Sequence, residues 1–226
     1  MYNYLKLLKV RGCFMSTNTL KNQVYDALLS DIVSGVYSAD TILTEKFLME
    51  KYNVSRAPIR EALSQLIGTH ILSSLPRQGY KILQLSGQQL FEIVKFRSAL
   101  ESSFLSSYYM YIDEARIEEL IKVNMDFNNC PENDFINRWR YNCQFHLKLF
   151  SIYGNKYAYK LLEDAVHFQT IYFAQNMHFA SGDLHSALID YLKKGDIAMA
   201  LTILKADIEY LMPPSIFPAP VNPNEK

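Results

Sequence analysis

The chain has 226 residues, and its 23 Lys and Arg balance 23 Asp and Glu, so the formal net charge is zero. This length favours two domains over one, and no apolar run approaches the roughly 20 residues that a membrane helix needs. A net charge of zero by itself argues weakly against a nucleic-acid binder, and the distribution of charge along the chain is more informative. The three cysteines include no CxxC pair, which argues against a zinc finger or a disulfide framework and favours a reducing cytoplasm.

The sequence predicts four segments. Residues 1–15 are expected to form a flexible basic arm, or an extension ahead of a second possible start at Met15. Residues 16–85 and 86–212 are predicted to be two domains, because the character of the chain changes near Ser86. Residues 213–226 are rich in proline, which cannot continue a helix, so we expect an extended tail there.

Two short amphipathic helices joined by a tight turn are predicted between residues 43 and 67. The first starts at Thr44, whose hydroxyl can cap a helix, and stops near Asn53, which tolerates the left-handed conformation of a helix end. Its apolar residues recur at helical spacing and are expected to be buried: Leu43, Phe47 and Leu48. This pattern is that of a helix-turn-helix.

The second of these helices is expected to enter a DNA groove. Ser55 offers an N-cap, and Pro58 stiffens the first turn, where a missing N–H is least harmful. Arg56 and Arg60 lie four residues apart, so they are neighbours that can reach bases or phosphates together. A solvated basic face is the alternative. The DNA-binding hypothesis requires both guanidinium groups to project from the helix, so burial or pairing with acidic neighbours would contradict it.

A β-hairpin is predicted to follow. Residues 72–75 and 80–83 have the pattern of two short strands, and Gly79 supplies the positive φ that the connecting turn needs. Arg77 and Gln78 lie at the tip, where they could reach the minor groove or a phosphate. A plain surface hairpin is the alternative.

A set of residues from Val24 to this hairpin matches a known family in order and spacing: Val24 to Leu28, Ile32, Gly35, Leu43, Glu45, Leu48, Tyr52, Val54 to Arg56, Pro58 to Leu63, Leu66, Leu72 and Arg77 to Tyr80. The set resembles the winged helix-turn-helix of GntR-type bacterial transcription regulators. Of these, Val24 to Leu28, Ile32 and Gly35 resemble the family's first helix and the approach to its second. One departure is Ala39-Asp40, where the family has Pro-Gly, and it concerns the loop before the helix that starts at Thr44. Spacing and resemblance together predict a DNA-binding surface made of Thr44, Lys46, Ser55, Arg56, Pro58, Arg60, Arg77, Gln78 and Gly79.

The basic excess of this first domain is small. Residues 16–85 hold seven Lys and Arg against six Asp and Glu, a net of about +1, while residues 86–226 hold thirteen against seventeen, a net of about −4. A module this weakly charged gains little from counterion release. We therefore predict that two copies act together, as a homodimer on a two-fold operator.

The chain after residue 86 is helical in pattern throughout. We expect helices at 87–111, 114–128, 132–153, 156–177, 182–194 and 197–211. Apolar faces and many Tyr and Phe residues supply a bundle core. The predicted fold is therefore mostly α, with an N-terminal winged helix-turn-helix followed by an all-α bundle.

Three segments of this bundle resemble the FCD ligand-binding domain of FadR-like GntR regulators: Arg97 to Glu101, Phe145-His146 and His185 to Asp196. The resemblance implies a divalent metal inside the bundle, at the positions Asn142, His146, His185 and Asp207. Asn142 stands where the family has aspartate, and Asp207 where it has histidine. Two imidazoles, one carboxylate and one amide oxygen suit zinc, nickel or manganese. The alternative is that both histidines are hydrogen-bonded core residues around a metal-free effector cavity.

The bundle also holds candidates for binding a carboxylate effector, because guanidinium groups recognise carboxylates with paired hydrogen bonds. These candidates are Arg97, Arg138, Arg140 and Tyr172. Ion pairs of the arginines with Glu101 or Asp134, and packing of the tyrosine, are the alternatives.

These features predict a cytoplasmic DNA-binding transcription regulator whose operator affinity responds to a small molecule, most simply an organic acid. An enzyme using a metal on His146 and His185 is one alternative, but no HExxH motif, nucleophile elbow or paired carboxylates accompany these residues, so we predict that the protein is not an enzyme. An interaction module that keeps the helices without reading DNA is the other alternative.

Overall fold

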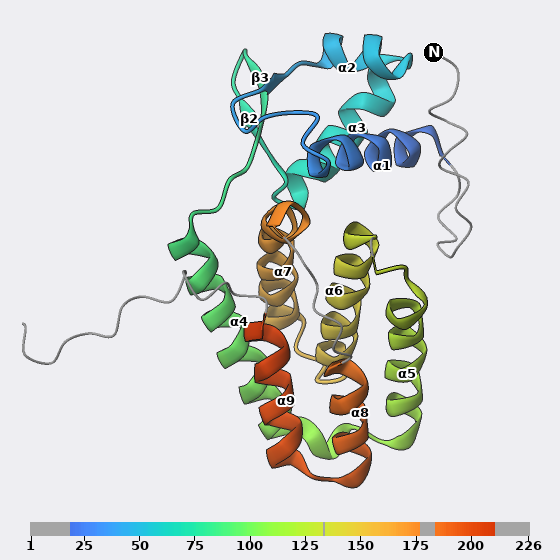
Figure 1. Ribbon diagram of the computed structural model, residues 1–226, viewed down its shortest axis with the longest axis vertical. Helices are drawn as coiled ribbons and strands as arrows, with labels where there is room; N and C mark the ends of the chain where they lie inside the picture. The colour runs from blue at the N-terminus through green and yellow to red at the C-terminus, as the bar shows by residue number, and fades with distance from the viewer. Residues whose placement is uncertain (1–18, 133, 177–183, 211–226) are drawn as a thin grey trace, which may run out of the picture.

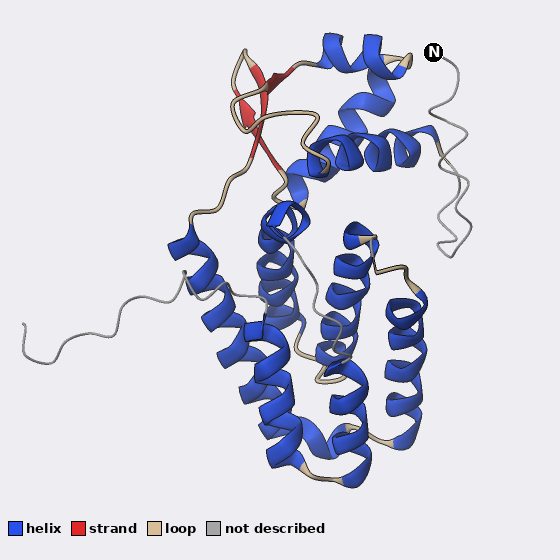
Figure 2. Cartoon of the chain, in the orientation of Figure 1, coloured by secondary structure: helices blue, strands red, loops and turns tan. Residues whose placement is uncertain are grey.

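The computed structural model describes residues 19–132, 134–176 and 184–210 (Figure 1). The predicted N-terminal arm and Pro-rich tail lie outside these residues. Within them, no helix combines the length and apolar character needed to cross a membrane. Among the described residues helices predominate, and the strands form one small sheet in the N-terminal part (Figure 2).

The N-terminal part is a winged helix-turn-helix. Its elements are α1 (Leu20–Val33), β1 (Ile42–Leu43), α2 (Glu45–Tyr52), α3 (Arg56–Gly68), β2 (Leu72–Leu75) and β3 (Gly79–Ile82). The strands form an antiparallel sheet in the order β1-β3-β2, in which Leu43 faces Tyr80 and Leu72 faces Ile82. The sheet therefore ties the entry of α2 to the hairpin after α3.

The helix boundaries predicted for α2 are confirmed at both ends, but the predicted burial is wrong for one residue. Thr44 Oγ1 accepts a hydrogen bond from the backbone N–H of Phe47 at 3.2 Å, and Asn53 is left-handed with φ 53°. Leu43 and Leu48 are fully buried, whereas 44% of Phe47 is exposed. The Phe47 ring lies at the rim, edge-on to Tyr37.

A compact apolar core holds this part together. Helix α3 contributes the stripe that its sequence predicts, since its buried residues recur at helical spacing. They pack against α1, α2 and the sheet, in a cluster of Val24, Leu28, Leu29, Ile32, Tyr37, Leu43, Leu48, Ile59, Ala62, Leu63, Leu66, Ile71, Leu72 and Ile82. The opposite side of α3 is left for solvent or a partner.

The second part is a helical bundle. Its elements are α4 (Gly87–Tyr108), the 3₁₀ turn η2 (Tyr109–Tyr111), α5 (Glu114–Asn129), α6 (Phe135–Ser151), α7 (Lys156–Asn176), α8 (Leu184–Lys194) and α9 (Ile197–Tyr210). Ser86 and Gln89 form a capping box that starts α4. Helix α6 begins at Phe135 rather than at residue 132 as predicted, because the Asp134 side chain caps it by accepting the N–H of Asn137.

The bundle encloses a second apolar cluster, which includes Trp139, Phe145, Leu149, Phe150, Leu162, Leu188 and Leu204. Helices α8 and α9 are neighbours, as the short turn between them predicts, and α4 packs against both α7 and α9. The winged part lies at one end of the bundle, where α1 meets α7 (Figure 1). A buried polar network interrupts the apolar core at its centre.

Candidate functional site

The two arginines of α3 project into solvent as predicted, with 67% of each side chain exposed. They are not free of acidic neighbours, however. Glu45, the first residue of α2, reaches both: its Oε2 lies 3.2 Å from Arg56 Nε, and its Oε1 lies 3.3 Å from Arg60 Nε. The expectation that no acidic group pairs with these arginines is therefore wrong.

Pairing with an acidic neighbour, which the sequence-based hypothesis treats as contradicting DNA contact, does not exclude that contact here, because both arginine side chains remain largely exposed. An exposed ion pair contributes only about 0–1 kcal/mol to stability. A guanidinium that leaves such a pair for a phosphate or a guanine edge gives up this small contribution and gains charge-assisted hydrogen bonds. Glu45 also accepts a hydrogen bond from Tyr80 of β3 at 3.4 Å. The carboxylate therefore links α2, α3 and the wing.

The remaining α2 and α3 residues of the predicted surface surround this pair. Lys46 and Ser55 are exposed, and Thr44 and Pro58 are partly exposed at the starts of the two helices. Ser55 occupies the N-cap position of α3, but its side chain accepts no hydrogen bond from that helix, so its predicted capping role is wrong.

The wing presents Arg77 and Gln78 at its exposed tip. Arg77 is itself left-handed, with φ 63°, so the turn does not rely on Gly79 alone as the sequence suggested. Gly79 has φ 138°, and a Cβ added there would lie 2.3 Å from the carbonyl oxygen of Leu43. Glycine is thus required by the close approach of β1. Together with the start of α2, the wing borders a shallow surface groove lined by Thr44, Glu45, Arg77, Gln78 and Tyr80.

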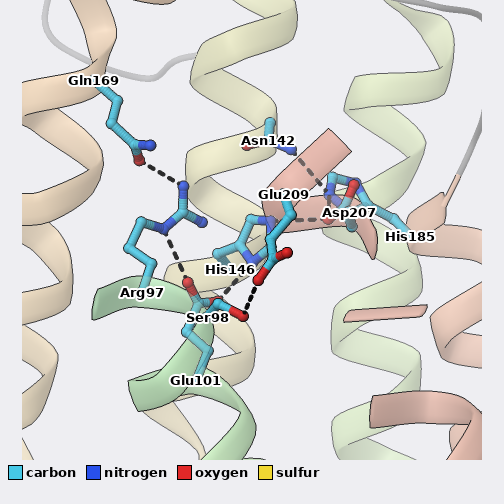
Figure 3. A network of polar contacts seen from close by, with 9 residues as sticks. All are labelled: Arg97, Ser98, Glu101, Asn142, His146, Gln169, His185, Asp207 and Glu209. Atoms are coloured by element: carbon cyan, nitrogen blue, oxygen red, sulfur yellow. Dashed lines mark hydrogen bonds and ion pairs between the residues drawn. The ribbon is translucent and has the colours of Figure 1, made fainter. Parts of the chain in front are cut away.

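Three of the four predicted metal-ligand side chains converge inside the bundle (Figure 3). His146 of α6 and His185 of α8 direct their Nε2 atoms to one oxygen, Asp207 Oδ2 of α9, at 3.0 and 3.2 Å. Both imidazoles are almost fully buried. Asn142, one turn before His146, places its Nδ2 3.2 Å from His185 Nε2. The four residues therefore form one cluster.

A second set of polar groups holds the outer nitrogens of both rings. His146 Nδ1 lies 2.7 Å from Glu101 Oε2, and His185 Nδ1 lies 3.1 Å from Asn124 Oδ1. Partners of this kind fix the orientation and tautomer of metal-binding histidines. Asn124 gave no signal in the sequence, because a single polar residue on an otherwise apolar helix face has no distinctive spacing.

The charges of this cluster shift one another's protonation. Burial alone would lower the pKa of His146, but the charge of Glu101 and hydrogen bonds with Asp207 and Glu101 outweigh it and raise this pKa to about 9. Burial likewise opposes ionisation of Asp207, yet the neighbouring histidines hold the pKa of its carboxyl far below the ordinary value. The metal-free cluster is thus an imidazolium between carboxylates.

The donor set fits a divalent cation. Asn142 Oδ1 is buried and accepts no hydrogen bond from any described residue, and Asp207 Oδ2 is buried between the two imidazole nitrogens. Amide oxygen and nitrogen are assigned from the surrounding contacts, so rotating the Asn142 amide by half a turn would present its oxygen to the same centre. Two imidazole nitrogens and two oxygens are ligands that zinc, nickel and manganese accept.

Arg97, one of the predicted effector-binding residues, continues this network. Its Nε donates to Glu101 Oε1 at 3.0 Å and its Nη1 to Gln169 Oε1 of α7 at 2.7 Å (Figure 3). The predicted alternative, an Arg97–Glu101 ion pair, is therefore present. Arg97 Nη2 and Gln169 Nε2 are buried and have no hydrogen-bond partner among the described residues.

The other predicted effector residues lie outside the network. Arg138 donates to the Cys130 carbonyl at 3.1 Å and covers the Phe127 ring. Arg140 is partly exposed, pairing with Asn137 and, at 3.6 Å, with Asp26 of α1. The guanidinium of Arg140 therefore points to the winged part and not to the buried network, and its role in effector binding stays a prediction. Tyr172 packs against the apolar cluster.

Comparisons with known proteins agree with this fold. Residues 20–82 match the family described as bacterial regulatory proteins, gntR family. An uncharacterised HTH-type transcriptional regulator of Bacillus subtilis, YdhC, is 30% identical over 76% of this chain and 80% of its own length. The Escherichia coli repressor GlaR is 26% identical over 62% of this chain and 66% of its own. The gluconate operon repressor of B. subtilis is 32% identical, but over less than half of each protein.

Two solved structures share the fold at low sequence identity. E. coli McbR/YncC has a TM-score of 0.63 at 20% identity, covering 86% of this chain and 95% of its own. A regulator from Rhodococcus sp. RHA1 has a TM-score of 0.62 at 19% identity, covering 84% and 94%. Winged module, exposed arginine pair and relatives together define a DNA-binding transcription regulator and not an enzyme. The chain belongs to the GntR family of bacterial regulatory proteins.

Proposed function

We propose that this regulator acts as a homodimer on a two-fold operator and that a small carboxylate, held in the buried polar network of an FCD-type bundle, controls its operator affinity. The observation that carries the proposal is the convergence of His146, His185 and Asp207 at the centre of the bundle. A polar centre of this kind costs stability unless it binds something or is fully paired, and Asn142 Oδ1, Arg97 Nη2 and Gln169 Nε2 have no hydrogen-bond partner among the described residues.

The cation is the first part of the proposal. His146 and His185 would hold it through Nε2 and Asp207 through Oδ2, with Asn142 as the fourth donor after rotation of its amide. Glu101 and Asn124 would keep the two rings oriented from outside. When bound, the cation supplies a positive centre that can accept a carboxylate oxygen of the effector.

The chemistry of the effector follows from the donors beside the cluster. Arg97 Nη2 and Gln169 Nε2 are buried N–H groups that meet no hydrogen-bond acceptor in the described part of the chain, so a ligand that reaches them must accept hydrogen bonds. Arg97 is also a permanent cation, which favours an anion. A small organic acid meets both requirements, and relatives named for the gluconate operon are consistent with this class.

The DNA side of the proposal rests on the exposed face of α3 and the wing tip. The weak net charge of the winged module is the reason for proposing a dimer, because two half-sites double the number of phosphate contacts. Effector control then requires two arrangements of the winged modules. The change in operator affinity equals the change in effector affinity that DNA causes, by reciprocity.

One experiment tests both the DNA-binding part and the effector-binding part of the proposal. DNA fragments are selected from a random pool by the purified protein, and binding to the selected operator is measured as candidate organic acids are titrated. We expect a two-fold symmetric operator and at least one acid that changes its affinity. The Arg56→Ala, Arg60→Ala double variant should lose operator binding while keeping its melting temperature and oligomeric state.

Three results would separate the alternatives. Failure to select any sequence would indicate an interaction module that does not read DNA. A selected operator whose affinity no acid changes would indicate a constitutive regulator. Absence of zinc, nickel and manganese from the purified protein, together with failure of all three to bind on addition, would remove the cation from the proposal.

A further inference from the structure

Besides the contacts of α1 with α7 and of Asp26 with Arg140, the winged module meets the bundle at His70, in the loop directly after the recognition helix α3. Its ring stacks on Phe168 of α7, with centroids 3.8 Å apart and planes inclined by 9°. His70 Nε2 lies 3.7 Å from Asp164, one turn earlier on α7, but that carboxylate has a closer partner in Lys160 at 3.0 Å. The ring stack is therefore the main contact, and the ion pair is secondary.

The backbone around His70 joins this ring tightly to α3. The His70 N–H donates to the Ile67 carbonyl at 3.0 Å and the next N–H, of Ile71, to the Leu66 carbonyl at 2.8 Å. His70 itself is left-handed with φ 56°, a conformation in which non-glycine residues are uncommon. The backbone that carries this ring is thus hydrogen-bonded to the last turn of the recognition helix, so a displacement of the ring can be passed to the end of that helix.

On the other side of the contact, α7 also faces the buried network. Phe168 is followed directly by Gln169, which is fully buried and accepts the hydrogen bond from Arg97 Nη1 at 2.7 Å. Adjacent helical residues point about 100° apart, so a single turn of α7 carries one side chain to the winged module and one to the network. From Arg97 the contacts continue through Glu101 and His146 to Asp207.

We propose that this turn of α7 couples the two parts of the molecule. The hydrogen bonding of Arg97 and Gln169 sets the position of Phe168. Phe168 in turn sets the position of the C-terminal end of α3, through its contact with His70. This inference rests on the proposed function for the ligand that changes the network, but the coupling itself is a property of the free protein. The pair His70–Phe168 is then a positioning device for the recognition helix and takes no part in contacting DNA.

Amide hydrogen exchange of the full-length protein tests the contact without ligand or DNA. Phe168→Ala lies in the bundle, yet it should speed exchange in the peptide covering residues 66–72 of the winged module by about threefold, the size expected for loss of one aromatic stack. His70→Ala should do the same. Tyr157→Ala is the matched control, because it removes an exposed aromatic side chain from the same helix, far from His70. Unchanged exchange in both variants would overturn the proposal.

A double-mutant comparison tests the path through the helix. Gln169→Ala, which cuts the link to Arg97, should alter exchange at residues 66–72 in the wild-type background and not in the His70→Ala background. An equal effect in both backgrounds would show that the network does not act through this contact. Operator affinity of the same variants is the second readout, with the same expected pattern. If the wild-type protein selects no operator, the proposed function fails, while the exchange measurements still decide the coupling.

Discussion

The carboxylate of Glu45 lies 3.2 Å from Arg56 Nε, so an acidic residue of α2 sits beside the arginines that the recognition helix offers to DNA. With its other oxygen on Arg60, it holds both guanidinium groups from one side. It also places a negative charge close to where phosphates would approach. The arrangement favours few, oriented contacts over strong general attraction.

Glu45→Gln should therefore raise affinity for random DNA and lower the preference for the operator. The released arginines can each take a phosphate, so the slope of log K against log salt should steepen by about 1 to 2. Filter binding or fluorescence anisotropy across a salt series measures both quantities. Glu50→Gln, which removes the same charge from an exposed position of α2, is the control. Equal slopes for wild type and Glu45→Gln would contradict this role.

Replacing Gly79 with alanine tests the wing. The added Cβ would meet the Leu43 carbonyl at 2.3 Å, so the wing must move away from β1. We expect a loss of stability on the order of 1–3 kcal/mol and weaker operator binding, because Arg77 and Gln78 shift with the strand. Gly35→Ala is the control: its φ is also positive, at 74°, but its Cβ would meet no atom. Thermal unfolding of both variants should show the larger loss for Gly79→Ala.

Much of this surface could be predicted from the sequence because it depends on local rules. The Thr44 cap, the left-handed Asn53 and the stripe of α3 each follow from residues a few positions apart. In the sequence Glu45 is only one residue of a family pattern. Its contact with Arg56 and Arg60 depends on how α2 and α3 cross, which local spacing does not reveal. Phe47 has the spacing of a core residue, but α2 is short and the core ends beneath it.

The buried polar network likewise contains residues that the sequence predicts and residues that it does not. Spacing and resemblance brought together His146, His185 and Asp207, but Gln169 lies 72 positions from its partner Arg97 and carries no motif. Arg140 was grouped with Arg97 because both are arginines in the bundle. Only the packing of α1 against the bundle shows that it faces Asp26 instead.

The buried cluster should make the stability of the metal-free protein depend on pH. His146 has a pKa of about 9 when folded, above its ordinary value of 6.5, so its contribution is complete below pH 6.5 and is lost as pH rises through 9. Before compensating effects, the shift corresponds to a contribution on the order of 3 kcal/mol. With chelator present, the melting temperature should fall between pH 6.5 and 9. His146→Gln should be less stable at pH 6.5 and show a flatter profile, and an unchanged slope would contradict this assignment.

The acidic side of the profile has the opposite sign. The pKa values of Asp207 and Glu101 are lowered by folding, so their contribution is present above their ordinary values of 3.8 and 4.5 and is lost as pH falls below them. Asp207→Asn should weaken this acid-side loss. The metal-free protein is therefore expected to be most stable between about pH 5 and 6.5.

Asn142→Asp tests the proposed cation site directly. The new carboxylate would stand one turn before His146, beside His185, and would replace a neutral amide by a charged ligand. We expect zinc affinity to rise at least about tenfold, because hard and borderline cations bind carboxylate more strongly than amide oxygen. Without metal the same variant should be less stable than wild type, since a second buried carboxylate then lies near Asp207. Calorimetric titration and thermal unfolding with and without zinc measure both effects.

Asn124→Asp is the matched control, because Asn124 contacts the outer nitrogen of His185 and not the metal centre. An equal gain in zinc affinity from both substitutions would point to general electrostatic attraction rather than to Asn142 as a ligand.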